Sequence, residues 1–319
     1  MFKTIAVAGV LVLMAQVAFA ADVWPTRPIR MVVPFSAGGS TDLTARVIAE
    51  GLRPVLGQTA LVDNRPGAAG NIAAELVAKA TPDGYTYLVS GATMAANMSL
   101  FRNLRYDFMR DFVHVSQTFS SSNVLVVSPS LAVSNLAEFI AVVKSGQPTV
   151  NYGTAGHGSS QHLAGALFNH MVGGKMVHIT YKGGAPAALA LLAGEIQTIF
   201  APIIEALPHI RSGAIKALAL GGRKRSPLLP GVPPISDLVP GYETSSWGGI
   251  SAPANTPLAI VNKLSAALAK VLTQPAVKTH MAEADKEAVG SSPAEFRQFI
   301  IADIERLRMQ VRISGATVD

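Results

Sequence analysis

Two loops rich in glycine and hydroxyl side chains carry the clearest chemical signal in the sequence. The first, residues 35–42, and the second, residues 154–160, each follow a predicted strand and precede a predicted helix. Glycine allows close backbone approach, and the N–H groups and dipole of a first helical turn favour an anion. We therefore expect the two loops to bind one small anion together. The candidate ligand-binding residues here are Phe35, Ser36, Gly38, Gly39, Ser40, Thr41, Asp42, Thr154, Ala155, Gly156, His157, Gly158 and Ser159.

Both loops also allow simpler interpretations. Ser40 and Ser159 are good helix N-caps, and Asp42 is expected to favour its helix N-terminus rather than to touch a ligand. Neither loop has the glycine and lysine spacing of a nucleotide-binding phosphate loop. Ser159 and His162 fall on one helical turn, so a serine hydrolase that uses them as nucleophile and base is an alternative. The preferred interpretation is non-enzymatic and assigns no catalytic residue.

Other polar positions stand at the ends of further predicted strands. Asn64 and Gly67 lie in a third loop, residues 64–71, which can add amide or backbone donors. Tyr181 ends a strand, where it either lines the pocket or belongs to the core. The chain has seven histidines, no cysteine and no His-Glu-x-x-His pattern. Structural roles are therefore expected for the histidines, and no metal site or cofactor is assigned.

Strand patterns alternate with helix patterns along the chain, which predicts an α/β protein with largely parallel sheets. An irregular stretch is expected after Ser90. The predicted strands span 29–35, 60–63, 85–90, 124–127, 150–152, 177–181, 197–200, 215–220 and 246–251. The predicted helices include 72–79, 134–144, 159–171, 185–193, 203–211, 256–273, 275–284 and 293–314.

The order of these elements predicts two lobes. Nothing strand-rich follows Ser251, so the C-terminal helices are expected to pack back on the first sheet. Lobe 1 then comprises residues 21–122 plus 246–319, and lobe 2 comprises residues 123–245. Two such lobes, joined by two connections, form a hinge with a ligand cleft between them.

The N-terminus and the composition indicate an exported protein. Residues 1–20 combine Lys3, an apolar run and a small-residue ending, which predicts a signal peptide cleaved after Ala20 and a periplasmic mature chain. The formal charge is +6, but aromatic residues are only 6% of the chain and basic clusters are scarce. Nucleic-acid binding is therefore not expected, and we expect a monomer.

In series, these motifs closely resemble the Bug family, the extracytoplasmic solute receptors of tripartite tricarboxylate transporters. The resemblance spans almost the whole mature chain and rests on runs at residues 24–30, 32–42, 64–70, 82–86, 152–159, 181–184 and 229–233. It implies a two-lobed, type II-like periplasmic-binding-protein fold, with a mixed, mostly parallel sheet in each lobe. It also implies a small organic mono- or dicarboxylate as ligand and membrane permease subunits as partners. A receptor that senses the same ligand without a dedicated permease is a further alternative.

One departure from the family pattern bears on the ligand. Ala201 stands where some relatives carry an aspartate that suits amino-group recognition. We therefore include Ala201 among the candidate ligand-binding residues, at the far end of the pocket. On this resemblance, the ligand is expected not to be an amino acid.

Overall fold

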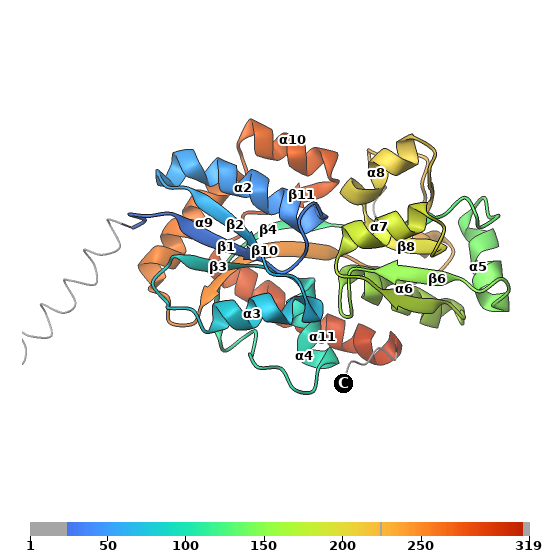
Figure 1. Ribbon diagram of the computed structural model, residues 1–319, viewed down its shortest axis with the longest axis horizontal. Helices are drawn as coiled ribbons and strands as arrows, with labels where there is room; N and C mark the ends of the chain where they lie inside the picture. The colour runs from blue at the N-terminus through green and yellow to red at the C-terminus, as the bar shows by residue number, and fades with distance from the viewer. Residues whose placement is uncertain (1–23, 224, 315–319) are drawn as a thin grey trace, which may run out of the picture.

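The computed structural model describes residues 24–223 and 225–314. Within them lie two β-sheets set side by side along the long axis of the molecule, each flanked by helices (Figure 1). The predicted signal peptide lies outside the described residues. In the described part of the chain, no helix combines the length and apolarity needed to span a bilayer.

The first sheet is mixed, with the order β11-β4-β10-β3-β1-β2. β1 pairs in parallel with β2 and β3, and β10 runs antiparallel between β3 and β4. Because β11 is antiparallel to β4, four of these six strands run in one direction. The strands are β1 (Ile29–Val33), β2 (Ala60–Asn64), β3 (Thr86–Gly91), β4 (Phe112–Ser121), β10 (Ser246–Pro253) and β11 (Lys286–Ala288).

The second sheet has the order β7-β6-β8-β5-β9. β6 pairs in parallel with β7 and β8, whereas β5 is antiparallel to both β8 and β9. The chain enters this sheet directly after β4 and leaves it after β9. The strands are β5 (Asn123–Val127), β6 (Asn151–Thr154), β7 (Val177–Thr180), β8 (Thr198–Pro202) and β9 (Lys216–Leu220).

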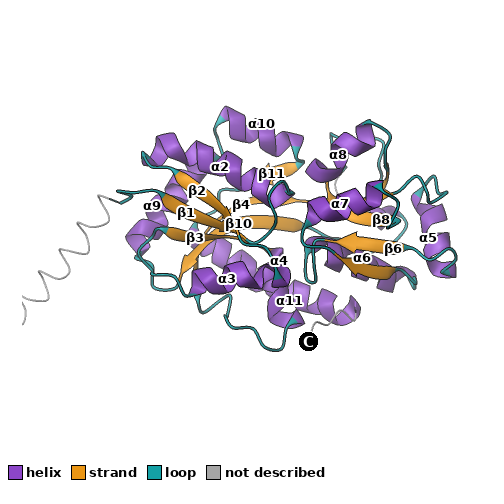
Figure 2. Ribbon diagram, in the orientation of Figure 1, coloured by secondary structure: helices purple, strands orange, loops and turns teal. Residues whose placement is uncertain are grey.

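Helices cover both faces of each sheet (Figure 2). In the first lobe they enclose one apolar cluster on each side of the sheet, and the second sheet likewise has a cluster on each face. The helices are α2 (Ser40–Leu56), α3 (Asn71–Ala78), α4 (Ala92–Leu100), α5 (Leu136–Ser145), α6 (Ser160–Val172), α7 (Gly184–Leu192), α8 (Ile203–Arg211), α9 (Leu258–Val271), α10 (Pro275–Glu283) and α11 (Pro293–Ser314), with short 3₁₀ turns at Ala68–Gly70 and Ile235–Asp237.

The C-terminal helices pack back on the first sheet, as expected. α9 contacts α2 and β4, and α11 contacts α4 and β4. α11 also reaches α6 of the second lobe, so that Leu163 joins the same apolar cluster as Phe296 and Ile300. Trp247 of β10 is fixed to this helix, because its indole Nε1 donates to Asp303 Oδ2 at 2.7 Å.

Two sequence expectations fail in the first lobe. The stretch after Ser90 is not irregular, because it contains α4 and the ten-residue strand β4. β4 buries polar side chains such as Ser116 and Thr118, so it lacks the apolar run expected of a strand. α4 is buried on most faces and therefore shows little amphipathic periodicity. The C-terminal region also contributes a strand, β11.

Candidate ligand-binding site

A cavity lies between the two sheets, and both glycine-rich loops contribute to its wall. From the first lobe, the loop before α2, the β3–α4 junction, the end of β4 and the start of β10 line it. From the second lobe, the loop before α6 and the starts of α7 and α8 line it. The lining residues are Phe35, Ser36, Gly39, Ser40, Thr41, Val89, Ser90, Gly91, Ala92, Thr93, Phe119, Ser121, Ala155, Ser159, Ser160, Gln161, Gly184, Pro202, Glu205, Ser246, Trp247 and Gly248.

Five helices begin at this wall, namely α2, α4, α6, α7 and α8. Their first turns have N–H groups without intrahelical partners, and each dipole presents partial positive charge. Among these described helices, only α6 has a side-chain cap, from Ser159. The N-caps of the other four, Gly39, Gly91, Gly183 and Pro202, make no capping side-chain bond. The wall therefore offers free donors to an anion from both lobes.

Glu205 is the one ionisable side chain among the residues that line the cavity. It comes from the first turn of α8, yet its Oε1 accepts a hydrogen bond from Ser40 N of α2, in the other lobe, at 2.8 Å. A Cβ at Gly184 would lie 2.3 Å from Glu205 Oε2, so glycine makes room for this carboxylate. Burial raises the pKa of Glu205, against the opposing effects of the Ser40 N–H and the Lys286 charge.

A buried lysine supports Ser40 from behind. Lys286 is 6% exposed, and its Nζ donates to Ser40 O at 3.3 Å and to Thr44 Oγ1. The ammonium also lies 4.2 Å from the centre of the Phe119 ring. Burial lowers the pKa of Lys286 to about 7, although Glu205 opposes the shift. The first turn of α2 is thus held between a carboxylate on its N–H side and an ammonium on its C=O side.

Asp42 organises the first loop without touching the cavity. Its Oδ2 accepts from Gly38 N at 2.9 Å and from Arg46 Nε at 3.0 Å, and its Oδ1 accepts from Asn64 Nδ2 at 2.9 Å. Burial alone would raise the pKa of Asp42, but these hydrogen bonds outweigh it and lower the pKa. Asn64 also donates to Phe35 O at 3.0 Å. The hydrogen bonds among Asp42, Gly38 and Asn64 therefore fix the conformation of the first loop without lining the cavity.

The second loop differs from the first in how it uses its glycines. A Cβ at Gly158, which has a φ of +73°, would lie 2.6 Å from Asn97 Oδ1 and from Leu100 Cδ1 of α4. Gly156, with a φ of +128°, lies against Ala69 in the loop that contains Gly67. These glycines provide close packing between the lobes, whereas Gly39 faces the cavity.

The structure divides the predicted residues into two groups. Those on the cavity wall are Phe35, Ser36, Gly39, Ser40, Thr41, Ala155 and Ser159. Those away from this wall are Gly38, Asp42, Asn64, Gly67, Thr154, Gly156, His157, Gly158, Tyr181 and Ala201. Tyr181 packs beneath Gly153, and Ala201 lines a smaller cavity inside the second lobe, which also borders Glu205.

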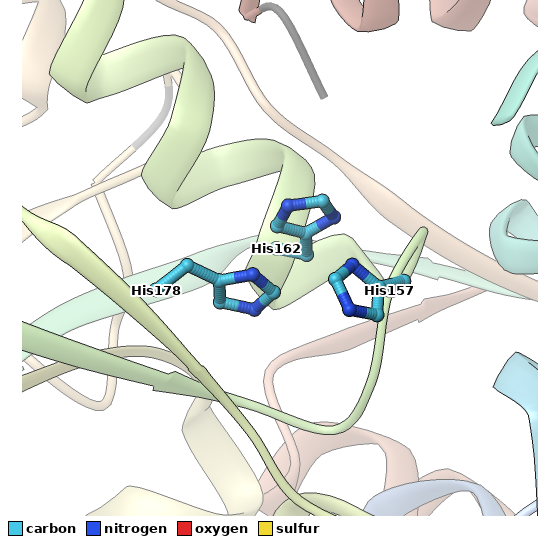
Figure 3. Close-up of side chains that lie close together, drawn as sticks. All are labelled: His157, His162 and His178. Atoms are coloured by element: carbon cyan, nitrogen blue, oxygen red, sulfur yellow. The ribbon is translucent and has the colours of Figure 1, made fainter. Parts of the chain in front are cut away.

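Three histidines gather behind the second loop (Figure 3). The rings of His162 and His178 stack at 4.1 Å between centroids, and His157 lies edge-on to both. His162 Nδ1 accepts from Gly158 N at 3.0 Å, and His178 Nε2 pairs with Thr154 Oγ1 at 2.7 Å. The ring nitrogens come within 4.8 Å of one another, close enough for a candidate metal site.

The orientation of these rings favours a structural role over metal binding. A neutral His162 that accepts at Nδ1 carries its proton on Nε2, so that nitrogen has no free lone pair. The planes of His162 and His178 differ by only 14°, and in-plane lone pairs of nearly parallel, stacked rings do not converge on one ion. We therefore assign the cluster the task of holding the backbone of Gly158 and the side chain of Thr154 in place.

Ser159 and His162 do not form a nucleophile and base pair in this structure. Ser159 Oγ donates to Gly156 O at 2.8 Å and accepts from the backbone N of His162, while the His162 ring bonds Gly158 N. Ser159 thus acts as the N-cap of α6. This geometry does not support the hydrolase alternative.

Replacing Ser159 by alanine is expected to lower the free energy of unfolding by about 1 kcal/mol, the usual cost of losing a helix N-cap. Urea unfolding followed by circular dichroism measures this change. Ser160→Ala, one residue further along the same loop, is the matched control because Ser160 is not the cap. An unchanged stability in Ser159→Ala would contradict the capping role.

Comparisons with known proteins agree with the fold. Residues 44–315 match the model of the tripartite tricarboxylate transporter family receptor. The chain belongs to this receptor family. Protein BugT of Bordetella pertussis is 36% identical over 321 residues, which covers 99% of this chain and 98% of BugT. The resemblance to the Bug family is thus confirmed.

Solved structures of this receptor family superimpose closely on the chain. Rpa4515 of R. palustris with adipate is 36% identical, with a TM-score of 0.88, and covers 92% of this chain and 98% of its own. The periplasmic binding protein BugD is 31% identical, with a TM-score of 0.89, and covers 92% and 99%. The predicted periplasmic-binding-protein fold is therefore confirmed, with mixed sheets in which most strands share one direction.

Several residues of the site were not predicted from the sequence. Thr93 escaped because α4 was not predicted, and Phe119 and Ser121 because β4 was not. Glu205 and Lys286 look like ordinary surface charges of a first helical turn and a short loop. The sequence signal that could have found Glu205 is the glycine pair 183–184, whose second glycine packs against it.

Proposed function

We propose that this receptor captures a small organic mono- or dicarboxylate in the cavity between its lobes, without chemical conversion, and presents it to the membrane subunits of a tripartite tricarboxylate transporter. The observation that carries the proposal is the convergence of five helix N-termini on one cavity, with those of α4, α7 and α8 free of capping side chains. Among the described residues, no lysine or arginine side chain lines that cavity, so the helix ends and hydroxyls supply the attraction for an anion. The relative Rpa4515 was solved with adipate, a dicarboxylate.

The proposed capture mechanism is closure of two lobes, residues 21–122 plus 246–319 and residues 123–245. The membership of β5 to β9 in one sheet and of β10 in the other supports this division. Each lobe supplies only some of the helix N-termini whose N–H groups face the cavity. The closed form therefore offers an anion more hydrogen bonds than the open form does. Ligand binding then shifts the population towards closure.

We also propose that the chain is exported to the periplasm and that residues 1–20 are removed after Ala20. The basis is the apolar N-terminal pattern of the sequence, together with the periplasmic relative BugD. Mass spectrometry of the protein recovered from the periplasm would give a chain that begins at Ala21.

Carboxylates are expected to stabilise the purified mature receptor against heat. A ligand present at 100 times its Kd adds about 2.7 kcal/mol to the free energy of unfolding, because it binds the folded state only. A thermal-shift panel of mono- and dicarboxylates, with the corresponding amides as uncharged controls, measures the effect. If the folded receptor responds to no carboxylate, or equally to the amides, the proposed function is wrong.

A further inference from the structure

Among the described residues that line the cavity, Glu205 is the only ionisable one, and its negative charge does not suit a plain anion site. Five helix N-termini attract negative charge to this cavity, yet the Glu205 carboxylate already stands among them and bonds Ser40 N at 2.8 Å. A second carboxylate brought against Glu205 would be repelled, and the low polarity of a closed site strengthens that repulsion. Lys286 offsets only part of this charge, so the end of the ligand that lies against Glu205 is favoured when it is positively charged.

A second acceptor on the wall, Gln161 Oε1, lacks a donor among the described residues. Gln161 is 3% exposed. Buried acceptors are nearly always satisfied, so this one points to a donor supplied by a ligand. Gln161 lines the same cavity as Glu205 and lies in the first turn of α6. The cavity thus combines free N–H donors for an anion with two acceptors for a cation.

From this pairing of charges we propose that the receptor selects carboxylates that also carry an ammonium group, with Glu205 as the specificity-determining residue. The inference rests on the proposed carboxylate-receptor function. The ligand carboxylate binds at the N-termini of α4 and α6, near Thr93 and Ser160, and the ammonium donates to Glu205 and to Gln161 Oε1. An ammonium has three N–H donors, enough for both acceptors.

The proposal replaces the expectation based on position 201. Ala201 removes a carboxylate from β8, but Glu205 supplies one at the start of the following helix, and both residues border the same small cavity of the second lobe. Gly184 fits this arrangement, because a side chain there would meet both oxygens of Glu205.

The test uses pairs of acids that differ only in the α-amino group: aspartate and succinate, glutamate and glutarate, phenylalanine and 3-phenylpropanoate. Isothermal titration of the mature receptor, freed of bound solutes by unfolding and refolding, gives each Kd. Within any pair that binds, the amino-bearing member is expected to bind about 10- to 100-fold more tightly, as for a hydrogen bond to a charged group.

Glu205→Gln keeps the shape and an acceptor for Ser40 N–H but removes the charge. It is expected to reduce the preference within each pair by at least about tenfold, and Glu205→Ala to do the same. Glu195→Gln, an exposed change in the same lobe, is the matched control and should leave the preference unchanged. Circular dichroism of each variant reports its folding. The ratio of the two Kd values within each pair of acids is measured on the wild type, so that test does not depend on any variant folding.

The outcomes separate this inference from the function on which it rests. If the wild type binds plain acids as tightly as their amino counterparts, the role of Glu205 in selection is wrong, while the carboxylate receptor stands. If the Glu205 variants gain affinity for every acid equally, Glu205 is an internal competitor for the anion site and the proposal fails. If the folded wild type binds no carboxylate, both proposals are overturned.

Discussion

Replacing Gly39 by valine is expected to weaken carboxylate binding by about 10- to 100-fold, because overpacking typically costs 1–3 kcal/mol. A Cβ at this position would lie 3.6 Å from Glu205 Oε1 and 3.7 Å from Ser36 O, where the lobes meet at the cavity wall. The two further methyl groups of valine would extend from there into the space for the ligand. The backbone at Gly39 is extended, with a φ of −80°, so valine fits the fold itself.

Isothermal titration with the tightest-binding acid measures this loss. Gly231→Val is the matched control, because a Cβ there meets nothing within 4 Å and Gly231 is not among the residues lining the cavity. The free energy of unfolding of Gly39→Val should change by only about 1 kcal/mol, since valine is a poorer N-cap than glycine. If Gly39→Val binds the acid as tightly as the wild type does, the assignment of the first loop to the binding site is wrong.

A valine in the second loop, at Gly158, would test the packing between the lobes rather than ligand binding. Valine at Gly158 would collide with Asn97 and Leu100 of α4 and would adopt a left-handed backbone, with a φ of +73°. We therefore expect Gly158→Val to disturb the packing between the lobes, and a loss of binding there could not be assigned to the ligand contact. The first loop is the informative position.

Acidification is expected to destabilise the receptor between about pH 6.5 and pH 4, and His162 is a principal cause. Burial, together with the neighbouring charges of His178 and His157, lowers the pKa of His162 to about 3. In this range the unfolded chain binds a proton at His162 and the folded chain does not, so stability falls as pH falls. From a reference pKa of 6.5 down to pH 4, this amounts to about 3 kcal/mol.

Urea unfolding at a series of pH values measures this slope. Burial also lowers the pKa of His114 to about 4, so part of the slope should persist in a His162→Gln variant. That variant should nevertheless lose stability less steeply than the wild type as the pH falls. His170→Gln, at an exposed position of the same helix, is the control and should keep the wild-type slope. An identical slope in His162→Gln and wild type would show that the cluster does not stay neutral.

The alternation of strands and helices could be predicted from the sequence because several strands are short apolar runs. β1, for example, is buried along almost its entire length and leads directly into the loop before α2. β4 could not be predicted, because it buries the side chains of Ser116 and Thr118, which donate to Ser291 O and Gly248 O, far away in the sequence. Such partners exist only after folding.

The candidate site was only partly predictable for a related reason. The two loops share a composition, and composition indicates flexible backbone near helix ends but not the direction each glycine faces. Gly39 faces the cavity, whereas Gly158 packs on α4. Glu205 and Lys286 both bond the backbone of Ser40, although all three residues are far apart in the sequence. No local sequence pattern links them.

The apolar contact between α6 of the second lobe and α11 of the first restricts how the two lobes can separate. Leu163 is buried there among Phe296, Ile300 and other side chains of α11, so parting the molecule along this line would expose a hydrophobic surface. On the side of α2, by contrast, hydrogen bonds cross the gap: Ser36 Oγ donates to Lys182 O at 2.7 Å, and Ser40 N donates to Glu205 Oε1. Water can replace such bonds at little cost. In the proposed closure, the lobes would therefore rotate about the contact between α6 and α11. The cavity would open beside α2, α7 and α8, and a solute would enter there.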